Sequence, residues 1–165
     1  MVKDAQIPPS RNGPKSGVRS PSTDPLFVLA VLVGPAGVVA WWAITGGPLD
    51  QMAPVGAWPA FLLIAVYPLL EEFVFRGLLQ SYLLEKAWAR RRAGPVTAAN
   101  ALTAIVFALS HWPRGGFLLA FGVLGPGLIF GYFRERHGGL ATPILLHGWY
   151  NACIAAAAWL APSLG

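Results

Sequence analysis

The chain has 165 residues, of which 55% are hydrophobic and only 12% are charged. Soluble domains carry about a quarter charged residues, so this composition excludes an ordinary water-soluble domain and indicates a membrane protein. The net charge of +5 comes from short cationic blocks between apolar segments, where Lys and Arg face anionic lipid headgroups, so nucleic-acid binding is not expected. The one cysteine, Cys153, allows no internal disulfide, and no Cys/His cluster predicts a structural zinc site.

Residues 1–25 are rich in Pro, Ser, Gly and basic side chains and contain little apolar surface, which predicts a disordered basic tail. Residues 26–45 carry no charge and are long enough, at about 1.5 Å per residue, to cross a hydrocarbon core of about 30 Å. We predict a transmembrane helix there, bent near Pro35. The stretch ends in two tryptophans and lacks a good small-x-small cleavage site, which favours an uncleaved anchor over a signal peptide.

Four further helices follow in the apolar pattern, so the predicted fold is an all-α, polytopic membrane bundle of about five transmembrane helices. One membrane domain, residues 26–165, accounts for everything after the tail. The first of these helices is expected to kink at Pro68, just before its charged residues. The expected ranges are 57–84, 96–111, 117–133 and 140–160.

The positions of the basic residues predict the topology. Ten of the twelve Lys and Arg fall in the tail and in the second and fourth connections. Of the other two, Arg114 lies in the third connection and Arg76 lies inside a helix. Because positive residues favour the cytoplasmic side of short loops, the N-terminus is expected in the cytoplasm and the C-terminus on the far side.

Two acidic residues, Glu71 and Glu72, lie in the middle of the predicted 57–84 helix. A charge at this depth costs about 2.5–3.5 kcal/mol on insertion scales, and such residues usually mark a function. Arg76 follows Glu72 by four residues, which predicts an ion pair on one helix face. Glu71 is rotated by about 100° and can point at another helix. We expect a supporting role for Glu72 and Arg76 and a chemical role for Glu71; a purely structural network is the alternative.

Two histidines complete the polar candidates. His111 closes the run 96–111, and Asn151 follows His147 by one helical turn, so these two face the same way. A carboxylate beside an imidazole can take a proton from water and pass it to a leaving amine, and His147 with Asn151 can stabilise an oxyanion. Two His and a Glu are also the ligands of hydrolytic zinc sites, so the residues leave metal-free and zinc-dependent hydrolysis open. Ser110 points about 100° away from His111 and no GxSxG motif is present, which argues against serine catalysis.

The predicted bounds leave one conflict, because Glu71 falls in mid-helix and His111 at the far end of its helix. The two meet only if the 57–84 helix starts later, or if the connection after His111 dips into a protein-lined cavity. Glycines 122, 125, 127 and 131 have a GxxxG-like spacing, which predicts close helix packing in the 117–133 segment.

Three motifs occur in order on successive hydrophobic segments: EExxxR at 71–76, FxxxH at 107–111 and HxxxN at 147–151. Over about residues 57–155, this ordered set resembles the CPBP family of CAAX proteases and bacteriocin-processing enzymes. The resemblance implies an intramembrane glutamic endopeptidase in which Glu71 and His111 activate water. It implies that His147 and Asn151 form the oxyanion site, and that Glu72 and Arg76 hold these groups in place.

The resemblance also implies a lipid-embedded enzyme in a prokaryotic cell (inner) membrane that acts on a membrane-protein or peptide substrate and needs no metal cofactor. A zinc-dependent form is the alternative. The chain has fewer helices than eukaryotic CAAX enzymes, which weighs against a prenylated substrate and favours the processing of C-terminal sorting signals. A non-enzymatic immunity or partner-binding protein of the same fold is the second class, and a transporter, for which paired broken helices would be expected, is the third.

Overall fold

The computed structural model describes residues 21–45 and 56–160 of the chain and is almost entirely helical within them, which confirms the all-α class. A short antiparallel hairpin, β1–β2, joins two of the helical segments. The elements are η1 (Pro21–Thr23), α1 (Pro25–Thr45), α2 (Ala57–Phe61), η2 (Leu62–Val66), α3 (Tyr67–Glu72), η3 (Phe73–Gln80), α4 (Ser81–Leu84), η4 (Ala87–Arg90), β1 (Arg92–Ala93), β2 (Val96–Thr97), α5 (Ala98–His137) and α6 (Ala141–Leu160).

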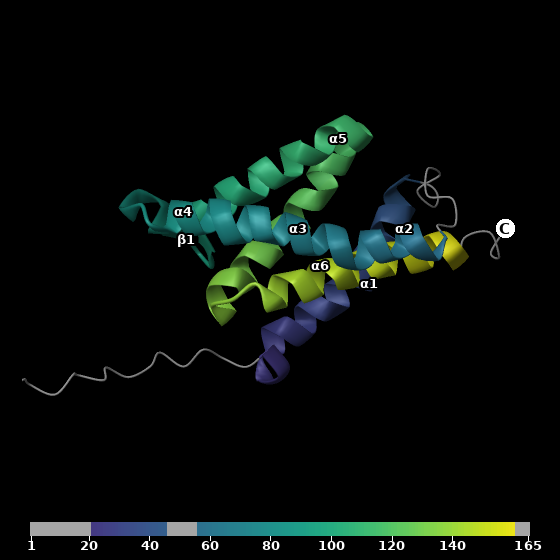
Figure 1. Cartoon of the computed structure of the whole chain (residues 1–165), viewed down its shortest axis with the longest axis horizontal. Coiled ribbons are helices and arrows are strands. Elements are labelled where there is room, and N and C mark those ends of the chain that lie inside the picture. The colour runs from purple at the N-terminus through teal and green to yellow at the C-terminus, as the bar shows by residue number, and fades with distance from the viewer. Residues whose placement is uncertain (1–20, 46–55, 161–165) are drawn as a thin grey trace, which may run out of the picture.

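The five elements from α2 to α4 follow one another without a gap and form a single helical rod over 57–84, as predicted (Figure 1). Two of its segments, η2 and η3, are π-helical. Pro68, in the first turn of α3, has no N–H to donate. In the π-helical pattern of η2 each N–H pairs with the carbonyl five residues earlier, so the carbonyl of Leu63 loses its helical partner. This carbonyl is available to another helix.

Helix α5 is two helices in succession, because its backbone leaves the helical conformation at Gly115 and Gly116. Gly116 has φ 63° and ψ −160°, a conformation that side chains with a Cβ essentially do not adopt. Figure 1 shows the chain doubling back at this point. The two halves, 98–114 and 117–137, correspond to the predicted helices at 96–111 and 117–133. The first begins two residues late because Val96 and Thr97 pair with β1, and Thr97 then caps the helix.

The two halves of α5 pack closely through small residues, as the glycine spacing predicted. A Cβ at Gly131 would lie 2.0 Å from Oδ1 of Asn100, and a Cβ at Gly127 would lie 3.4 Å from that of Ala104. These contacts pair 100 with 131 and 104 with 127, so the halves run antiparallel. Gly125, by contrast, faces open space.

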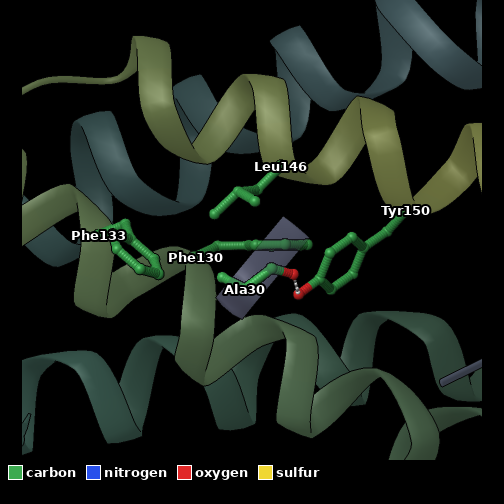
Figure 2. Packing of buried hydrophobic residues seen from close by; sticks show 5 residues of the cluster. All are labelled: Ala30, Phe130, Phe133, Leu146 and Tyr150. Carbon is green, nitrogen blue, oxygen red and sulfur yellow. Dashed lines mark hydrogen bonds between the residues drawn. The ribbon is translucent and has the colours of Figure 1, made fainter. Parts of the chain in front are cut away.

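Helix α1 and helix α6 enclose an apolar core together with the second half of α5 (Figure 2). The buried members are Ala30, Phe130, Phe133, Leu146 and Tyr150. Large apolar side chains are also exposed along the helices, among them Val39, Phe121 and Leu145, as expected for helices that face lipid. Within the described residues, α1 and α5 are the helices long and apolar enough to cross a membrane.

The prediction of a disordered tail through residue 25 is wrong for its last five residues. Pro21–Thr23 form a 3₁₀ turn, and Pro25 already belongs to α1. Asp24 between them is fully buried, and hydrogen bonds from Arg136 and His137 at the end of α5 offset the cost of burying its carboxylate. Positions 1–20 lie outside the described residues.

Candidate active site

The Glu72–Arg76 pair lies at the centre of the rod. Nη1 of Arg76 lies 3.0 Å from Oε1 of Glu72, and both side chains are fully buried, so the predicted pairing is confirmed. Nη2 of the same guanidinium donates to the carbonyl of Gly127 at 2.9 Å. Arg76 thus ties the rod to the second half of α5. One turn further on, Gln80 makes the matching contact with the carbonyl of Gly131.

His147 brings helix α6 into the same cluster. Its Nδ1 lies 2.9 Å from Oε1 of Glu72. Because a carboxylate oxygen only accepts, this nitrogen carries the proton. The other nitrogen, Nε2, then faces Oε2 of Glu71 at 3.7 Å, within ion-pair range but too far for a direct hydrogen bond. The ring of Phe130 stacks on the imidazole with a centroid distance of 4.9 Å and fixes its plane.

Glu71 and Glu72 have different surroundings although they are neighbours. Glu72 is inaccessible and holds Arg76 and His147, whereas Glu71 is 23% exposed and has His147 as its ion-pair partner. The 100° step between adjacent helical residues accounts for this division. Glu71 is therefore the carboxylate that an incoming molecule can reach.

His111 comes to the same depth as Glu71 but does not pair with it. The rings of Phe75 and Phe107 are in contact at 5.2 Å. The rod and the first half of α5 run antiparallel, because Gln80 lies beside Gly131, which also contacts Asn100. Glu71 comes four residues before Phe75 on the rod, and His111 comes four residues after Phe107 on α5. Because the two segments are antiparallel, both residues lie on the same side of the Phe75–Phe107 contact. Since the rod begins at Ala57 as predicted, the conflict is resolved by the short first half of α5, which turns back before reaching the rod's far end.

The imidazole of His111 is oriented by the backbone. Its Nδ1 lies 2.9 Å from the carbonyl of Phe107, so this nitrogen donates and Nε2 is the basic atom of the neutral ring. The ring packs on that of Phe107 at 4.6 Å. Phe107 also touches the ring of His147 at 5.8 Å, and it therefore lies between the two histidines. Among the described residues, no ion pair joins His111 to Glu71.

Asn151 holds helix α6 against the rod. Its Nδ2 donates to the carbonyl of Leu63 at 2.9 Å, the carbonyl that Pro68 leaves without a helical partner. The neighbouring carbonyl, that of Ile64, lies against Gly148, where a Cβ would come within 2.6 Å of the oxygen. A larger residue than glycine at 148 would push α6 away from the rod. One N–H of the Asn151 amide is engaged in this way, and its second N–H makes no hydrogen bond within the described residues.

Sequence reasoning assigned no role to three groups that shape the cluster. The rings of Phe107 and Phe130 lie 4.6 and 5.5 Å from the Arg76 guanidinium carbon, and the backbone of Gly127 accepts from it. Apolar periodicity cannot separate such rings from ordinary core residues. The position of Phe107 four residues before His111 was the available signal.

The fold and this cluster define a helical membrane protein with carboxylate, imidazole and guanidinium groups gathered at mid-helix. Residues 53–153 match the family model described as type II CAAX prenyl endopeptidase, Rce1-like, and the chain belongs to that family. The chain is therefore a membrane-embedded member of a family of CAAX-type proteases, and the family resemblance predicted from its motifs is confirmed. No curated protein and no solved structure matches the chain. Helix α1 lies outside the matched residues.

Proposed function

We propose that this protein is an intramembrane endopeptidase that hydrolyses a peptide bond of a membrane-associated substrate with water activated by Glu71 and His111. The observation that carries the proposal is the setting of the Glu71 carboxylate, which is partly exposed and lies 3.7 Å from the imidazole of His147. An acid that is neither saturated by partners nor required for packing is available for proton transfer.

The cluster has two carboxylates and one guanidinium. Glu72 holds the guanidinium of Arg76, and Glu71, the partly exposed carboxylate, is left for the reaction. In the proposed reaction the Glu71 carboxylate, assisted by Nε2 of His111, takes a proton from water as the hydroxide attacks the carbonyl carbon. The same proton then passes to the leaving amine as the C–N bond breaks.

His147 and Asn151 are the proposed oxyanion donors. Asn151 keeps one amide N–H beyond its bond to Leu63, and His147 donates through Nε2 when it is protonated. Glu72 and Arg76 support them: Glu72 accepts from His147, and Arg76 holds Glu72 and the second half of α5. In this arrangement the proposed catalytic residues come from three helical segments: the rod, the first half of α5 and α6. The supporting contacts join the rod to α6 and to the second half of α5.

The proposed arrangement is five transmembrane helices with the N-terminus in the cytoplasm of a prokaryotic cell. Ion pairs support it, since Arg92 meets Glu135 and Arg136 meets Asp24. The start of α1, the hairpin connection with four cations, and the end of α5 with Arg134 and Arg136 thus share one end of the molecule. The four cations of the tail precede the start of α1 in the sequence, so ten of the twelve are expected on one side of the membrane. For the substrate we propose a C-terminal sorting signal of a membrane protein.

The scheme needs no metal. Among the described residues, no group of three or more His, Cys, Asp or Glu lies close enough to hold a metal ion. Metal analysis of the purified protein is expected to find less than stoichiometric zinc, with cleavage unaffected by a chelator. A stoichiometric zinc signal that disappears in His147→Ala would replace this scheme with a zinc-dependent one.

Profiling of protein termini in native cells tests the function. Cells carrying the wild-type chain are compared with cells carrying Glu71→Gln, which keeps the shape and removes the carboxylate. We expect one processed end of a membrane protein to disappear in the mutant, and that end identifies the substrate. If no terminus changes while the mutant is as abundant as the wild type and supports the same phenotype, a non-enzymatic immunity or partner-binding protein becomes the better account.

A further inference from the structure

Helix α1 contacts helix α6 through two side-chain hydrogen bonds to its backbone. Nε1 of Trp149 donates to the carbonyl of Val31 at 2.8 Å, and the hydroxyl of Tyr150 donates to the carbonyl of Ala30 at 2.7 Å. Figure 2 shows the second bond beside the ring of Phe130. The donors lie between His147 and Asn151 in the sequence. The helix that carries two proposed catalytic residues is therefore bonded to a helix outside the matched family residues.

Pro35 explains why a carbonyl of α1 accepts from another helix. It lies inside α1 and has no N–H, so the carbonyl four residues earlier, that of Val31, has no helical donor. An unpaired carbonyl is costly where no water is present, and the indole N–H of Trp149 removes that cost. The carbonyl of Ala30 is different, because position 34 is a glycine with an N–H to offer. If the Tyr150 bond were lost, the Ala30 carbonyl could still accept from the backbone of α1. If the Trp149 bond were lost, the Val31 carbonyl would have no donor in its own helix.

The same device occurs on the opposite side of α6. Pro68 frees the carbonyl of Leu63 in the rod, and the Asn151 amide of α6 donates to it, while Gly148 packs against the neighbouring carbonyl of Ile64. Helix α6 thus lies between two proline-bearing helices, each of which offers a carbonyl without a helical donor. Successive residues of a helix differ by about 100° in direction, so positions 149 and 151 point to roughly opposite sides of α6. Hydrogen bonds from both positions therefore fix the rotation of α6 about its axis.

We propose that Trp149 is a positioning residue, which uses the Val31 carbonyl freed by Pro35 to hold the rotation of α6 and so keep His147 beside Glu71 and Glu72. The consequence for activity rests on the proposed endopeptidase function. Helix α1 is then part of the machinery that aligns the site and not only an anchor. A misplacement of about 1 Å at a reacting group can lower a rate about 100-fold.

Two substitutions separate positioning from simple stabilisation. Trp149→Phe keeps an aromatic ring and removes the N–H, which leaves the Val31 carbonyl without a donor. Pro35→Ala restores a backbone N–H that can pair with the same carbonyl. In the double variant the carbonyl is satisfied within α1, so thermal stability should recover towards that of Pro35→Ala alone. The Trp149 bond from α6 to α1 is still missing, and the remaining bond of Tyr150 to Ala30 does not replace it, so α6 should remain misplaced.

Cleavage of a peptide that spans the position found by terminus profiling measures the effect on the reaction. We expect kcat to fall about tenfold or more in Trp149→Phe and in the double variant, with KM changed less than about twofold. Pro35→Ala alone is the matched control: the Val31 carbonyl has two lone pairs and can accept from both the restored backbone N–H and Trp149, so kcat should stay close to the wild-type value. Recovery of both stability and kcat in the double variant would show that Trp149 only supplies a hydrogen-bond partner, and would overturn the proposal.

A distance measurement tests the positioning without any catalysis. Spin labels are placed at exposed Leu69 on α3 and exposed Leu145 on α6, in a chain with Cys153→Ala reconstituted in liposomes. We expect the label distance to shift or broaden in the double variant relative to Pro35→Ala. Identical distributions would overturn the proposal. If wild type and Glu71→Gln give the same termini, the proposed function fails, and the label distances still decide whether Trp149 positions α6.

Discussion

Two clusters in this protein have the same composition and different settings. In each, a buried carboxylate joins an arginine to a histidine: Glu72 with Arg76 and His147 at mid-helix, and Asp24 with Arg136 and His137 where α1, α5 and α6 meet. The carboxylate-to-imidazole distances are 2.9 and 3.0 Å. The difference lies at the second nitrogen of each histidine. That of His137 meets the hydroxyl of Thr142, and that of His147 faces the carboxylate of Glu71.

This comparison shows that the composition of a charged cluster does not by itself indicate chemistry. The Asp24 cluster is complete: its histidine has a partner at each nitrogen, and it connects three helices at their ends. Hydrogen bonds from Arg136 and then His137 hold the pKa of the Asp24 carboxyl well below its usual range. The mid-helix cluster has one carboxylate more than its structure needs. That additional carboxylate is what we assign to catalysis.

The largest contrast is expected between two histidine substitutions. His111→Ala should lower the cleavage rate about 10²–10⁴-fold, the usual contribution of a general acid or base, with the amount of folded protein unchanged. His137→Ala in the other cluster should do the reverse, lowering the unfolding temperature with little change in rate per folded molecule. Cleavage assays and thermal unfolding of the two purified variants measure this. Full activity in His111→Ala would remove that residue from water activation.

Breaking the buried pair should affect stability and activity together. Glu72→Gln leaves the Arg76 guanidinium without its counter-charge, and loss of one partner of a buried pair costs about 3–5 kcal/mol. Removing both partners, in Glu72→Gln with Arg76→Gln, should cost less than the sum of the two single changes, because no charge is left alone. Unfolding free energies of the four proteins provide the double-mutant cycle. Additive losses would contradict the supporting role that we give to this pair.

The smallest effect on activity is expected at Asp24. Asp24→Asn should lower stability and leave cleavage per folded molecule unchanged. A carboxylate whose pKa is lower in the folded protein contributes stability above its unfolded pKa of about 3.9, and loses it as the pH falls towards the folded value. The stability difference between wild type and Asp24→Asn should therefore be constant above about pH 5 and shrink below about pH 4. A difference that grows on acidification would refute the ion-pair account.

Much of the fold could be predicted from the sequence, because apolar runs and helix breakers are local signals. The rod at 57–84 has its predicted bounds, and the Glu72–Arg76 pair follows from a spacing of four residues on one helix. The ordered motifs also identified the family. Each of these predictions depends on residues that are close in the chain.

The features of the fold and the site that could not be predicted depend on contacts between segments that are far apart in the chain. Asp24 lies in a stretch rich in Pro and Ser that resembles a disordered tail, and its partners are more than a hundred residues away. The depth of His111 could not be judged without knowing that α5 turns back at Gly115 and Gly116. Carbonyls freed by Pro35 and Pro68 are visible in the sequence, but the side chains that meet them, Trp149 and Asn151, belong to another helix.

The most direct test of this account compares Glu71→Gln with Asp24→Asn in liposomes, each given the substrate that terminus profiling identifies. Both changes replace a carboxylate with an amide of the same shape. We predict that Glu71→Gln is folded and inactive, while Asp24→Asn is less stable and cleaves at the wild-type rate per folded molecule. Cleavage by Glu71→Gln at the wild-type rate would contradict the claim that its carboxylate activates the attacking water.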